Sequence, residues 1–256
     1  MKVSVITVSF NSARTIGDTL ASVAAQTHPD IEHLVIDGAS SDGTAGIVRR
    51  LGTRVTRLVS EPDKGIYDAM NKGLALATGD LVGFLNADDL YADDGAVGAI
   101  VEAANRSGAK VLYGDLVYVR ANNLQSTVRV WRSKPFVPNG LRLGWMPPHP
   151  TLYVQRETIN ALGGFNTAYR IAADYDFVLR CFGNRHMSTC YLPRVLVKMR
   201  LGGASNHSLG ALWRKSREDL QALRANAVGG LVTLLCKNVR KLPQFIRRDS
   251  SGIGTG

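Results

Sequence analysis

Hydrophobic residues in the first 90 positions follow two alternating patterns, which are short apolar runs and apolar residues three or four positions apart. Runs of this length are typical of strands, and the wider spacing is typical of helices that bury one face. The runs predict strands at 3–10, 32–37, 55–60 and 81–85. The spaced patterns predict helices with buried faces at 16–23, 47–51 and 66–74. This β-α-β-α-β-α-β order predicts an α/β fold with a Rossmann-like, mostly parallel sheet flanked by helices.

The pattern is less regular from residue 111 onward. Short apolar runs predict further strands at 111–113, 116–119, 127–131 and 151–154, with a hairpin turn at 121–123. The stretch 133–148 contains four prolines and predicts a long loop over a site. A short helix that ends at Gly163-Gly164 and a helix over 173–182 follow.

The last 45 residues carry apolar residues among Arg and Lys. The apolar positions recur at helical spacing, at Leu220, Leu223, Ala227, Leu231 and Leu234. This pattern predicts a basic amphipathic helical tail. We therefore expect one domain over 1–205, with halves at 1–115 and 116–205, then a C-terminal helical appendage over 206–249 and a disordered end over 250–256.

Composition supports a single folded domain. Of 256 residues, 45% are hydrophobic and 20% charged, which is enough to bury a core without disulfides or a structural metal. The three cysteines are odd in number and lack metal-ligand spacing, which favours reduced thiols in a cytoplasmic protein. The N-terminus does not resemble a signal peptide, and no run approaches the roughly 20 apolar residues that span a bilayer.

The net charge of +10 favours anionic partners, and it is unevenly distributed. Between Trp213 and Asp249 there are nine basic and three acidic residues. A basic amphipathic helix binds anionic lipid headgroups, so the tail predicts peripheral contact with the inner face of the cytoplasmic membrane. The alternative is that the same apolar face packs on the domain or on a second subunit.

Polar groups follow the predicted strands at the ends where parallel sheets bind ligands. These groups are Asn11, Asp37, the turn at 61–63 and the pair Asp88-Asp89. Chance polarity of loops explains one such strand end more easily than four. The sequence therefore predicts a ligand site at this edge of the sheet.

Asp88 and Asp89 are adjacent carboxylates directly after an apolar strand. Mg²⁺ and Mn²⁺ take oxygen ligands, commonly one or two carboxylates together with substrate phosphates. A metal in that place stabilises a diphosphate leaving group. The alternative is that Asp89 only caps the following turn.

Asp37 precedes a Gly/Ser turn at 38–43 that leads into a helix, an arrangement suited to a nucleoside beside a phosphate. In the segment 63–73, Lys64 and Lys72 can meet an anionic group and Asn71 can bind a base or ribose. A routine turn and a solvated helix face are the alternatives. The chain contains neither a dinucleotide-binding glycine motif nor a P-loop motif.

Two further residues are candidates for contact with an acceptor. Asp174 lies near the start of a predicted helix, where it can act as general base toward a hydroxyl or merely complement the helix dipole. His149 follows the proline-rich loop and can contact a diphosphate or an acceptor, although lone histidines are often structural.

Together these segments resemble the family 2 glycosyltransferases, which are inverting enzymes with the A-type glycosyltransferase fold. The similarity covers about residues 2–201. The matching motifs are SVITVSFN at 4–11, IDGASSDGT at 36–44, DKGIYDAMNKG at 63–73, GFLNADD at 83–89, His149, GGFN at 163–166 and AADYD at 172–176. Several of them match a subgroup that makes bacterial surface polysaccharides and glycolipids.

The resemblance implies a role for each motif. Residues 1–115 would bind a nucleoside-diphosphate sugar and 116–205 a glycan or lipid-linked acceptor. The donor-binding residues would be Ser9, Asn11, Asp37, Asp63, Lys64, Asn71, Asp88 and His149. Asp89 would hold Mn²⁺ or Mg²⁺ on the diphosphate, and Asp174 would be the general base. The chain departs from many relatives at two positions. At Gly38 those relatives have an acid, and at Ala173 they have a Glu or Gln.

Two other classes of function have less support. A sugar-nucleotide nucleotidyltransferase has a glycine-rich phosphate loop near its N-terminus, and residues 8–12 contain no glycine. A nucleic-acid-binding protein would suit the net charge, but the predicted edge of the sheet is acidic. We therefore expect no nucleic-acid partner.

Overall fold

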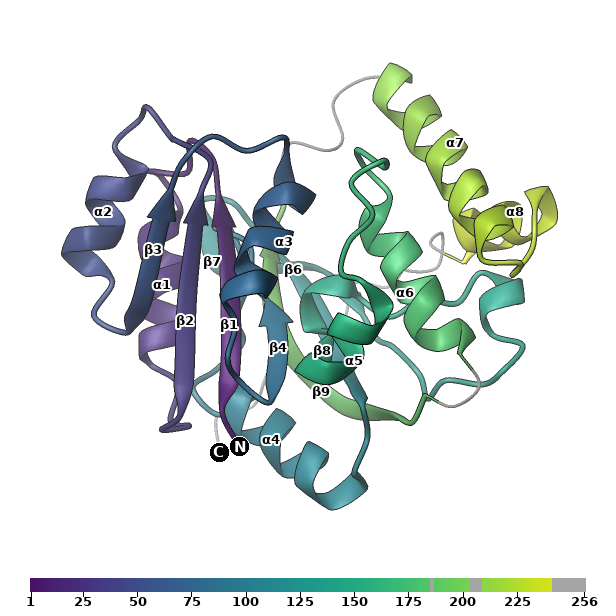
Figure 1. The fold of residues 1–256 in the computed structure, drawn as a ribbon, viewed down its shortest axis with the longest axis horizontal. Helices are drawn as coiled ribbons and strands as arrows, with labels where there is room; N and C mark the ends of the chain where they lie inside the picture. The colour runs from purple at the N-terminus through teal and green to yellow at the C-terminus, as the bar shows by residue number, and fades with distance from the viewer. Residues whose placement is uncertain (185–186, 203–208, 241–256) are drawn as a thin grey trace.

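The computed structural model describes residues 1–184, 187–202 and 209–240 (Figure 1). The strands are β1 (Val3–Ser9), β2 (Ile31–Asp37), β3 (Val55–Ser60), β4 (Leu81–Phe84), β5 (Leu90–Tyr91), β6 (Val111–Arg120), β7 (Asn123–Trp131), β8 (Tyr153–Gln155) and β9 (Thr189–Arg200). The helices are α1 (Ile16–Ala24), α2 (Thr44–Leu51), α3 (Ile66–Leu76), α4 (Ala96–Ser107), α5 (Arg156–Leu162), α6 (Ala173–Gly183), α7 (Leu209–Ala225) and α8 (Leu231–Val239). Two 3-10 turns, η1 (Leu141–Leu143) and η2 (His149–Thr151), complete the described elements.

The strands form one sheet in the order β3-β2-β1-β4-β8-β6-β9-β5, with β7 paired to β6. The first four strands in this order are mutually parallel, as their sequence pattern predicts. Helices α3, α5 and α6 pack on one face and α1, α2 and α4 on the other (Figure 1). The α/β fold with helices on both faces of the sheet is therefore confirmed.

The second half of the sheet is mixed rather than parallel. Strand β8 is antiparallel to both β4 and β6, whereas β9 runs parallel to β6. The sequence reading assigned neither α4 nor β9. Strand β9 was not predicted because Pro193 interrupts it and because its burial follows no regular alternation.

The stretch 133–148 differs from the loop over a site that its prolines predict. It includes η1 and carries Trp145, which is only 9% exposed. The Trp145 ring packs edge-on against Tyr113 and Phe182, with centroids 5.6 and 5.0 Å away. Aromatic packing therefore makes this stretch part of the core of the second half.

The tail forms two helices rather than one continuous helix. Ala227, with a φ of 52°, lies in the turn between α7 and α8. Ala222 and Leu223 of α7 are fully buried in the core of the second half. Packing on the domain, one of the two alternatives for the tail, therefore holds for its inner face, while the predicted end over 250–256 lies outside the described residues. In the part of the chain that the structure describes, no helix is long and apolar enough to cross a membrane.

Candidate active site

The carboxyl ends of β1, β2 and β3 meet at one edge of the sheet, together with the segment that follows β4. Ser9 pairs with Asp37 across β1 and β2, and Asp37 pairs with Ser60 across β2 and β3. The N–H of Ala87 donates to the carbonyl of Val8 over 3.3 Å, which places residues 86–89 beside the end of β1. The predicted convergence of polar strand ends is therefore present.

Asp37 is fully buried at this edge, and its carboxylate is hydrogen-bonded by serines. Oδ1 accepts from Ser9 and Ser40, and Oδ2 accepts from Ser60 (2.7 Å) and from the N–H of Ser40 (3.0 Å). Burial by itself raises the pKa of Asp37, but the hydrogen bonds from Ser40, Ser60 and Ser9 outweigh it, so the pKa lies below its ordinary value. In this conformation Asp37 organises the turn at 38–43, and contact with a nucleoside requires that a serine be displaced.

Gly38 lies where Asp63 and Phe10 approach the turn. A Cβ at Gly38 would come within 2.4 Å of the Asp63 carboxylate and 3.3 Å of the Phe10 ring. A second acid at position 38 would therefore have to displace the carboxylate of Asp63, which reaches that place from the β3–α3 turn. Phe10 is 65% exposed beside it. The sequence reading missed Phe10, although the aromatic ring stands between two predicted site residues.

Asn11 and Lys64 lie on the exposed rim of this edge. Asn11 has a φ of 48°, and its side-chain oxygen accepts from the N–H of Ser41 over 3.0 Å. Lys64 is exposed, and its ammonium group makes no ion pair with the residues that the structure describes. Lys72, by contrast, is bound to Glu61 over 2.8 Å. Of the two lysines in this segment, Lys64 is the one available to an anion.

Asp89 is fully buried after β4 and is poorly compensated. Its Oδ2 accepts from the Asn86 amide over 3.2 Å. Oδ1 of Asp89 and Oδ1 of Asn86 are both buried without a hydrogen-bond donor. Burial, and then the charge of neighbouring Asp88, raise the pKa of Asp89 well above its ordinary value. Burial raises the pKa of Asp88 as well.

These oxygens fit a divalent cation. Buried acceptors without a donor are costly, and a cation offsets both that cost and the repulsion between Asp88 and Asp89. Among residues 1–184, 187–202 and 209–240, no group of three or more His, Cys, Asp or Glu could hold a metal. The set therefore fits Mg²⁺ or Mn²⁺ bound by one or two carboxylates and completed by phosphates.

Arg200, at the end of β9, holds the segment with the two acids in place and is only 8% exposed. Its guanidinium donates to the backbone carbonyls of Asp88 (3.0 Å) and Ala121 (3.1 Å) and pairs with Asp18. Sequence reasoning missed Arg200 because it lies 112 residues from Asp88, on a strand that was not predicted.

Asp174 lies in the first turn of α6, across from α3. Its Oδ1 accepts from the Tyr67 hydroxyl (3.2 Å) and from the N–H of Tyr175 (2.8 Å). Oδ2 makes no hydrogen bond within the described chain. Tyr67 also donates to the carbonyl of Ile171 over 2.7 Å, so it links the two halves of the domain. The arrangement leaves one carboxylate oxygen able to accept a proton.

His149 lies between the two halves, in an aromatic cluster. Its ring stacks on Phe84 at 6.1 Å and meets the Phe165 ring edge-on at 5.9 Å. Both ring nitrogens are buried without a partner. Burial lowers the pKa of His149, and the charge of Asp174 opposes this. The ring is therefore neutral, with a free donor and a free acceptor.

Asn71 has a structural role in this conformation. Its amide nitrogen donates to the carbonyl of Phe165 (2.8 Å), and its amide oxygen accepts from the N–H of Phe165 (2.9 Å). The pair of bonds fixes the ring that packs against His149. Direct binding of a base or ribose by Asn71, which the sequence predicts, would have to use the second N–H or the second lone pair of this amide.

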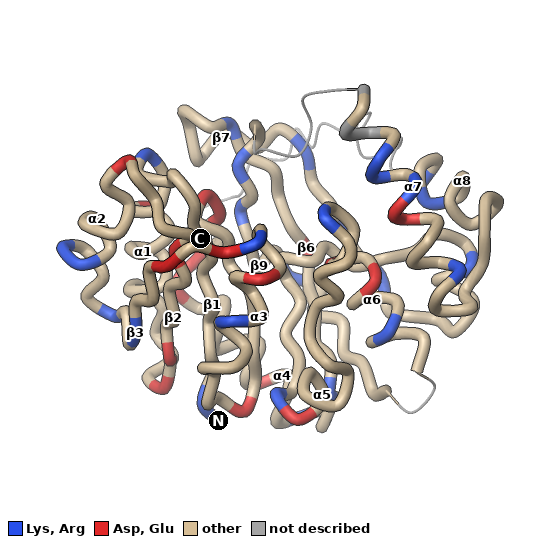
Figure 2. The backbone as a smooth tube through the Cα atoms, turned by 45° about the horizontal axis from the view of Figure 1, so that its top comes forward, with Lys and Arg blue, Asp and Glu red and all other residues tan. Residues whose placement is uncertain are grey.

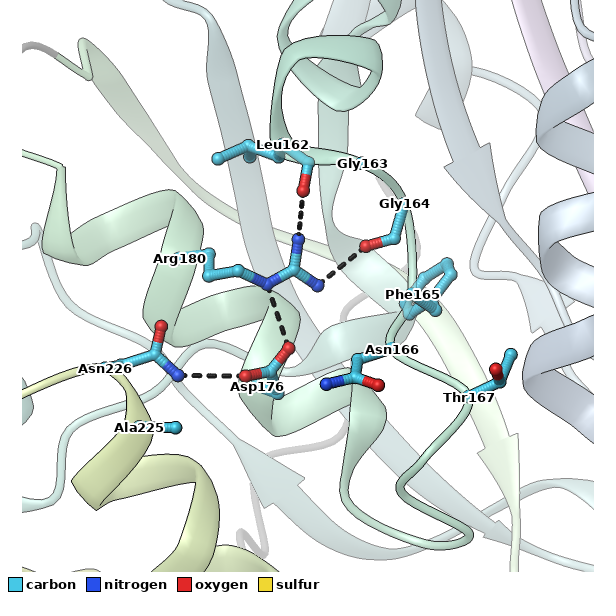
Figure 3. Close-up of a pocket in the computed structure, with 10 residues that line it drawn as sticks. All are labelled: Leu162, Gly163, Gly164, Phe165, Asn166, Thr167, Asp176, Arg180, Ala225 and Asn226. Atoms are coloured by element: carbon cyan, nitrogen blue, oxygen red, sulfur yellow. Dashed lines mark hydrogen bonds and ion pairs between the residues drawn. The ribbon is translucent and has the colours of Figure 1, made fainter.

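Asp176 lines a cavity of about 510 Å³ beside the end of α7 (Figure 3). Asp176 accepts from Arg180 (2.9 Å) and from Asn226 (2.9 Å). Arg180 also donates to the carbonyls of Leu162 and Gly164, each over 2.6 Å. The charged groups that line this cavity are paired with one another, so these residues dock α6 against the end of α7.

Comparisons with known proteins bear on this arrangement. The family model described as Glycosyl transferase family 2 matches residues 4–171. A PGL/p-HBAD biosynthesis glycosyltransferase of Mycobacterium bovis is 32% identical over 251 residues, which are 96% of this chain and 92% of the relative. An uncharacterized glycosyltransferase of Mycobacterium tuberculosis is 36% identical over 180 residues, which are 70% of this chain and 68% of the relative.

Solved structures share the fold. Staphylococcus aureus TarS, in complex with UDP-GlcNAc, matches with a TM-score of 0.69 and 20% identity, over 89% of this chain and 66% of that chain. The mannosyltransferase PcManGT of Pyrobaculum calidifontis, in complex with GDP-Man and Mn²⁺, matches with a TM-score of 0.67 and 21% identity, over 96% of this chain and 73% of that chain.

Proposed function

Because this chain belongs to glycosyl transferase family 2, we propose that it moves a sugar from a nucleoside-diphosphate-sugar donor to a hydroxyl of a glycan or lipid-linked acceptor. One observation carries the proposal. The buried oxygen of Asp89 that lacks a donor and the oxygen of Asp174 that makes no hydrogen bond among the described residues lie on two halves of the domain, which Tyr67 and the His149 cluster join.

The donor is proposed to bind along the edge formed by β1, β2 and the segment after β4. Phe10 offers an exposed ring for stacking on the base, and Lys64 offers an unpaired cation for the diphosphate. Asp37 shapes the turn beside them. Mn²⁺ or Mg²⁺ held by Asp89, with Asp88 beside it, would neutralise the diphosphate and stabilise it as a leaving group.

Transfer is proposed to proceed by a single displacement. Oδ2 of Asp174 removes the proton of the acceptor hydroxyl, and the hydroxyl oxygen attacks the anomeric carbon. The bond from that carbon to the diphosphate breaks on the opposite face, so the anomeric configuration inverts. His149, neutral and unpartnered, is placed to hydrogen-bond the donor or the acceptor.

A donor panel of UDP-, GDP- and dTDP-sugars, scored for release of nucleoside diphosphate with Mn²⁺, Mg²⁺ or EDTA, tests this function. We expect metal-dependent transfer, and a loss in Asp174→Asn of about 10²–10⁴-fold in kcat, the usual contribution of a general base. Glu157→Gln is the matched control, because Glu157 is also an acid in the first turn of a helix but is exposed. Full activity in EDTA, or an unimpaired Asp174→Asn, would contradict the mechanism.

The tail is proposed to bring the enzyme to an anionic membrane surface. The outer face of α8 presents Leu231, Val232, Leu235 and Val239, each between 52% and 76% exposed. Lys and Arg outnumber Asp and Glu along α7 and α8 (Figure 2). The only acids of these two helices within the described residues, Glu218 and Asp219, are buried, so the exposed charges there are positive. An apolar face with an arginine rim suits anionic lipid better than a second copy, which would oppose like charges.

Sedimentation with anionic and with neutral vesicles tests this surface. Because α7 supplies core residues, truncation of the tail would also disturb folding. Substitutions on the outer face of α8 therefore test the surface more specifically. Val232→Ser with Leu235→Ser should lose binding to anionic vesicles, while Leu51→Ser, an exposed apolar position on α2, should keep it. Equal binding by all three proteins would remove the membrane surface, and loss of a dimer in the double variant would assign the face to self-association.

A further inference from the structure

Glu218 of α7 reaches the peptide that precedes the proposed general base. Its carboxylate is 9% exposed, and Oε2 accepts from the N–H groups of Ile171 (2.8 Å) and Ala172 (3.0 Å). Helix α6 begins directly afterwards, and Ala172 at its N-cap has no side-chain oxygen with which to bind the free N–H groups of the first turn. The carboxylate that binds the two N–H groups just before this helix is therefore supplied by α7.

The same peptide is held from its other side by α3. The single hydrogen of the Tyr67 hydroxyl is shared between the carbonyl of Ile171 (2.7 Å) and Oδ1 of Asp174 (3.2 Å). Ile171 is thus fixed at its N–H by α7 and at its carbonyl by α3. Both bonds lie within three residues of Asp174, so they restrict where its carboxylate can point.

The next residue of α7 fixes the other side of Asp174. Asp219 pairs with Lys237 of α8 over 2.7 Å, and the Lys237 ammonium lies 3.3 Å from the centre of the Tyr175 ring. Both charged groups are only 3% exposed. A buried ion pair of this kind is sensitive to the loss of one partner and so holds a defined geometry. Glu218 therefore binds the backbone just before Asp174, and Asp219, through Lys237, contacts the residue just after it.

We infer that Glu218 is a positioning residue that orients Asp174 toward the acceptor hydroxyl through the Ile171–Ala172 peptide. The inference rests on the proposed role of Asp174. It gives the tail a part in catalysis, since α7 acts on the base through the backbone. Displacement of a reacting group by about 1 Å can lower a rate by about 10²-fold, so a small shift of this peptide is enough to matter.

Asn226 offers a matched control for helix docking. It lies just past the end of α7, and its amide donates to Asp176 of α6 over 2.9 Å without touching the peptide before Asp174 (Figure 3). A residue that only docks α7 on α6 should behave like Asn226. A residue that positions the base should change kcat and leave donor binding alone.

Steady-state kinetics of the full chain separate these roles. Glu218→Ala should lower kcat by about 10- to 100-fold with the donor KM unchanged. Glu218→Gln keeps an oxygen that accepts both N–H groups and should restore most of kcat. Tyr67→Phe, which frees the other end of the same peptide, should resemble Glu218→Ala. Asn226→Ala should keep kcat.

The outcomes divide cleanly. Equal losses of kcat in Glu218→Ala and Asn226→Ala, or no rescue by Gln in a folded protein, would overturn the positioning role while the proposed function stands. Transfer at the wild-type rate by Asp174→Asn would instead overturn the base assignment and the inference together. Thermal melting of each variant identifies unfolded protein. If Glu218→Ala does not fold, Glu218→Gln is compared with Tyr67→Phe instead. Of these two variants, only Tyr67→Phe should lose kcat.

Discussion

The proposed metal-binding role of Asp89 is accompanied by a cost in stability. Its carboxylate is buried next to Asp88, and one oxygen has no donor. Asn in its place would keep an acceptor for the Asn86 amide and remove the repulsion. The charge that fits this residue for a cation therefore destabilises the protein when no cation is bound.

Asp89→Asn should stabilise the metal-free protein by about 1 kcal/mol while abolishing transfer. Because the pKa of Asp89 is raised, the folded chain retains a proton that the unfolded chain releases above pH 3.8. The free energy of unfolding of the wild type thus falls as pH rises above 3.8, and the stability advantage of the variant should grow with pH. Urea denaturation in EDTA measures this, and a less stable variant would contradict it.

His33 gives the opposite dependence on pH. Burial, with a smaller contribution from the charge of Arg54, lowers the pKa of His33 from 6.5 to about 3. Below pH 6.5, His33 binds a proton in the unfolded chain, whereas in the folded chain it binds one only below about pH 3. Stability conferred by neutral His33 is therefore complete above pH 6.5 and lost as pH falls, by at most about 1.4 kcal/mol per pH unit.

The double variant Thr7→Val/His33→Leu tests this dependence. It removes the buried pair, whose atoms lie 2.9 Å apart, without leaving the Thr7 hydroxyl unpaired. Its unfolding free energy should change less with pH than that of the wild type between about pH 6.5 and 5. Equal slopes in urea denaturation would show that His33 titrates normally in the folded chain.

The polar strand ends could be predicted from sequence because each acid follows its own apolar strand. Asp37 and the Asp88-Asp89 pair stand at the predicted edge. Arg200 and Glu218 could not be predicted in this way, since their partners lie 112 and 46 or 47 residues away in the chain. Only the paired elements bring such residues together. The roles of the predicted site residues remain predictions.

At the scale of elements, β4 is the strand on which the parallel and mixed parts of the sheet meet. Gly83 at its centre faces Tyr153 of β8, and a Cβ there would come within 2.3 Å of the ring. The ring is held from its far end, because its hydroxyl is hydrogen-bonded to Tyr91. Neither β4 nor β8 can give way without breaking a buried contact.

Gly83→Ala should therefore lower the free energy of unfolding by about 1–3 kcal/mol. Gly98→Ala on α4 is the matched control, because no atom lies within 4 Å of a Cβ at that position. Alanine in a helix is favoured over glycine, so this control should be neutral or stabilising by about 0.5–1 kcal/mol. Equal effects of the two substitutions in urea denaturation would rule out the steric explanation.

Elements whose apolar residues recur at a regular spacing could be predicted from the sequence, and elements in which that spacing is interrupted could not. Strands β1 and β2 are apolar runs, and α1 carries buried residues at Ile16, Leu20 and Val23. Strand β9 contains a proline and is only partly buried, so its pattern fits a loop as well. The tail is helical, as predicted, but the turn at Ala227 could not be predicted, because it depends on backbone conformation that hydrophobic spacing does not record.

At the scale of the whole molecule, the tail and the second half share one core. Ala222 and Leu223 lie in the same cluster as Tyr175 and Phe177 of α6. A chain that ends at residue 202 should lose its cooperative thermal transition, because Tyr175 would face solvent and Lys237 would be gone. A chain that ends at residue 240 should melt like the full chain. Cooperative melting of the shorter chain would make the tail a separate unit.

The bonds that α3 and α7 make to Ile171 also set a rule for protein engineering. The family match ends at residue 171, three residues before Asp174. A chimera joined at that boundary would take Tyr67 from one parent and Glu218 from the other, and both must grip the same peptide. Exchange of this region between relatives should therefore move α6, α7 and α8 together, and the residue at position 67 of the host should be one that can bind the carbonyl at position 171.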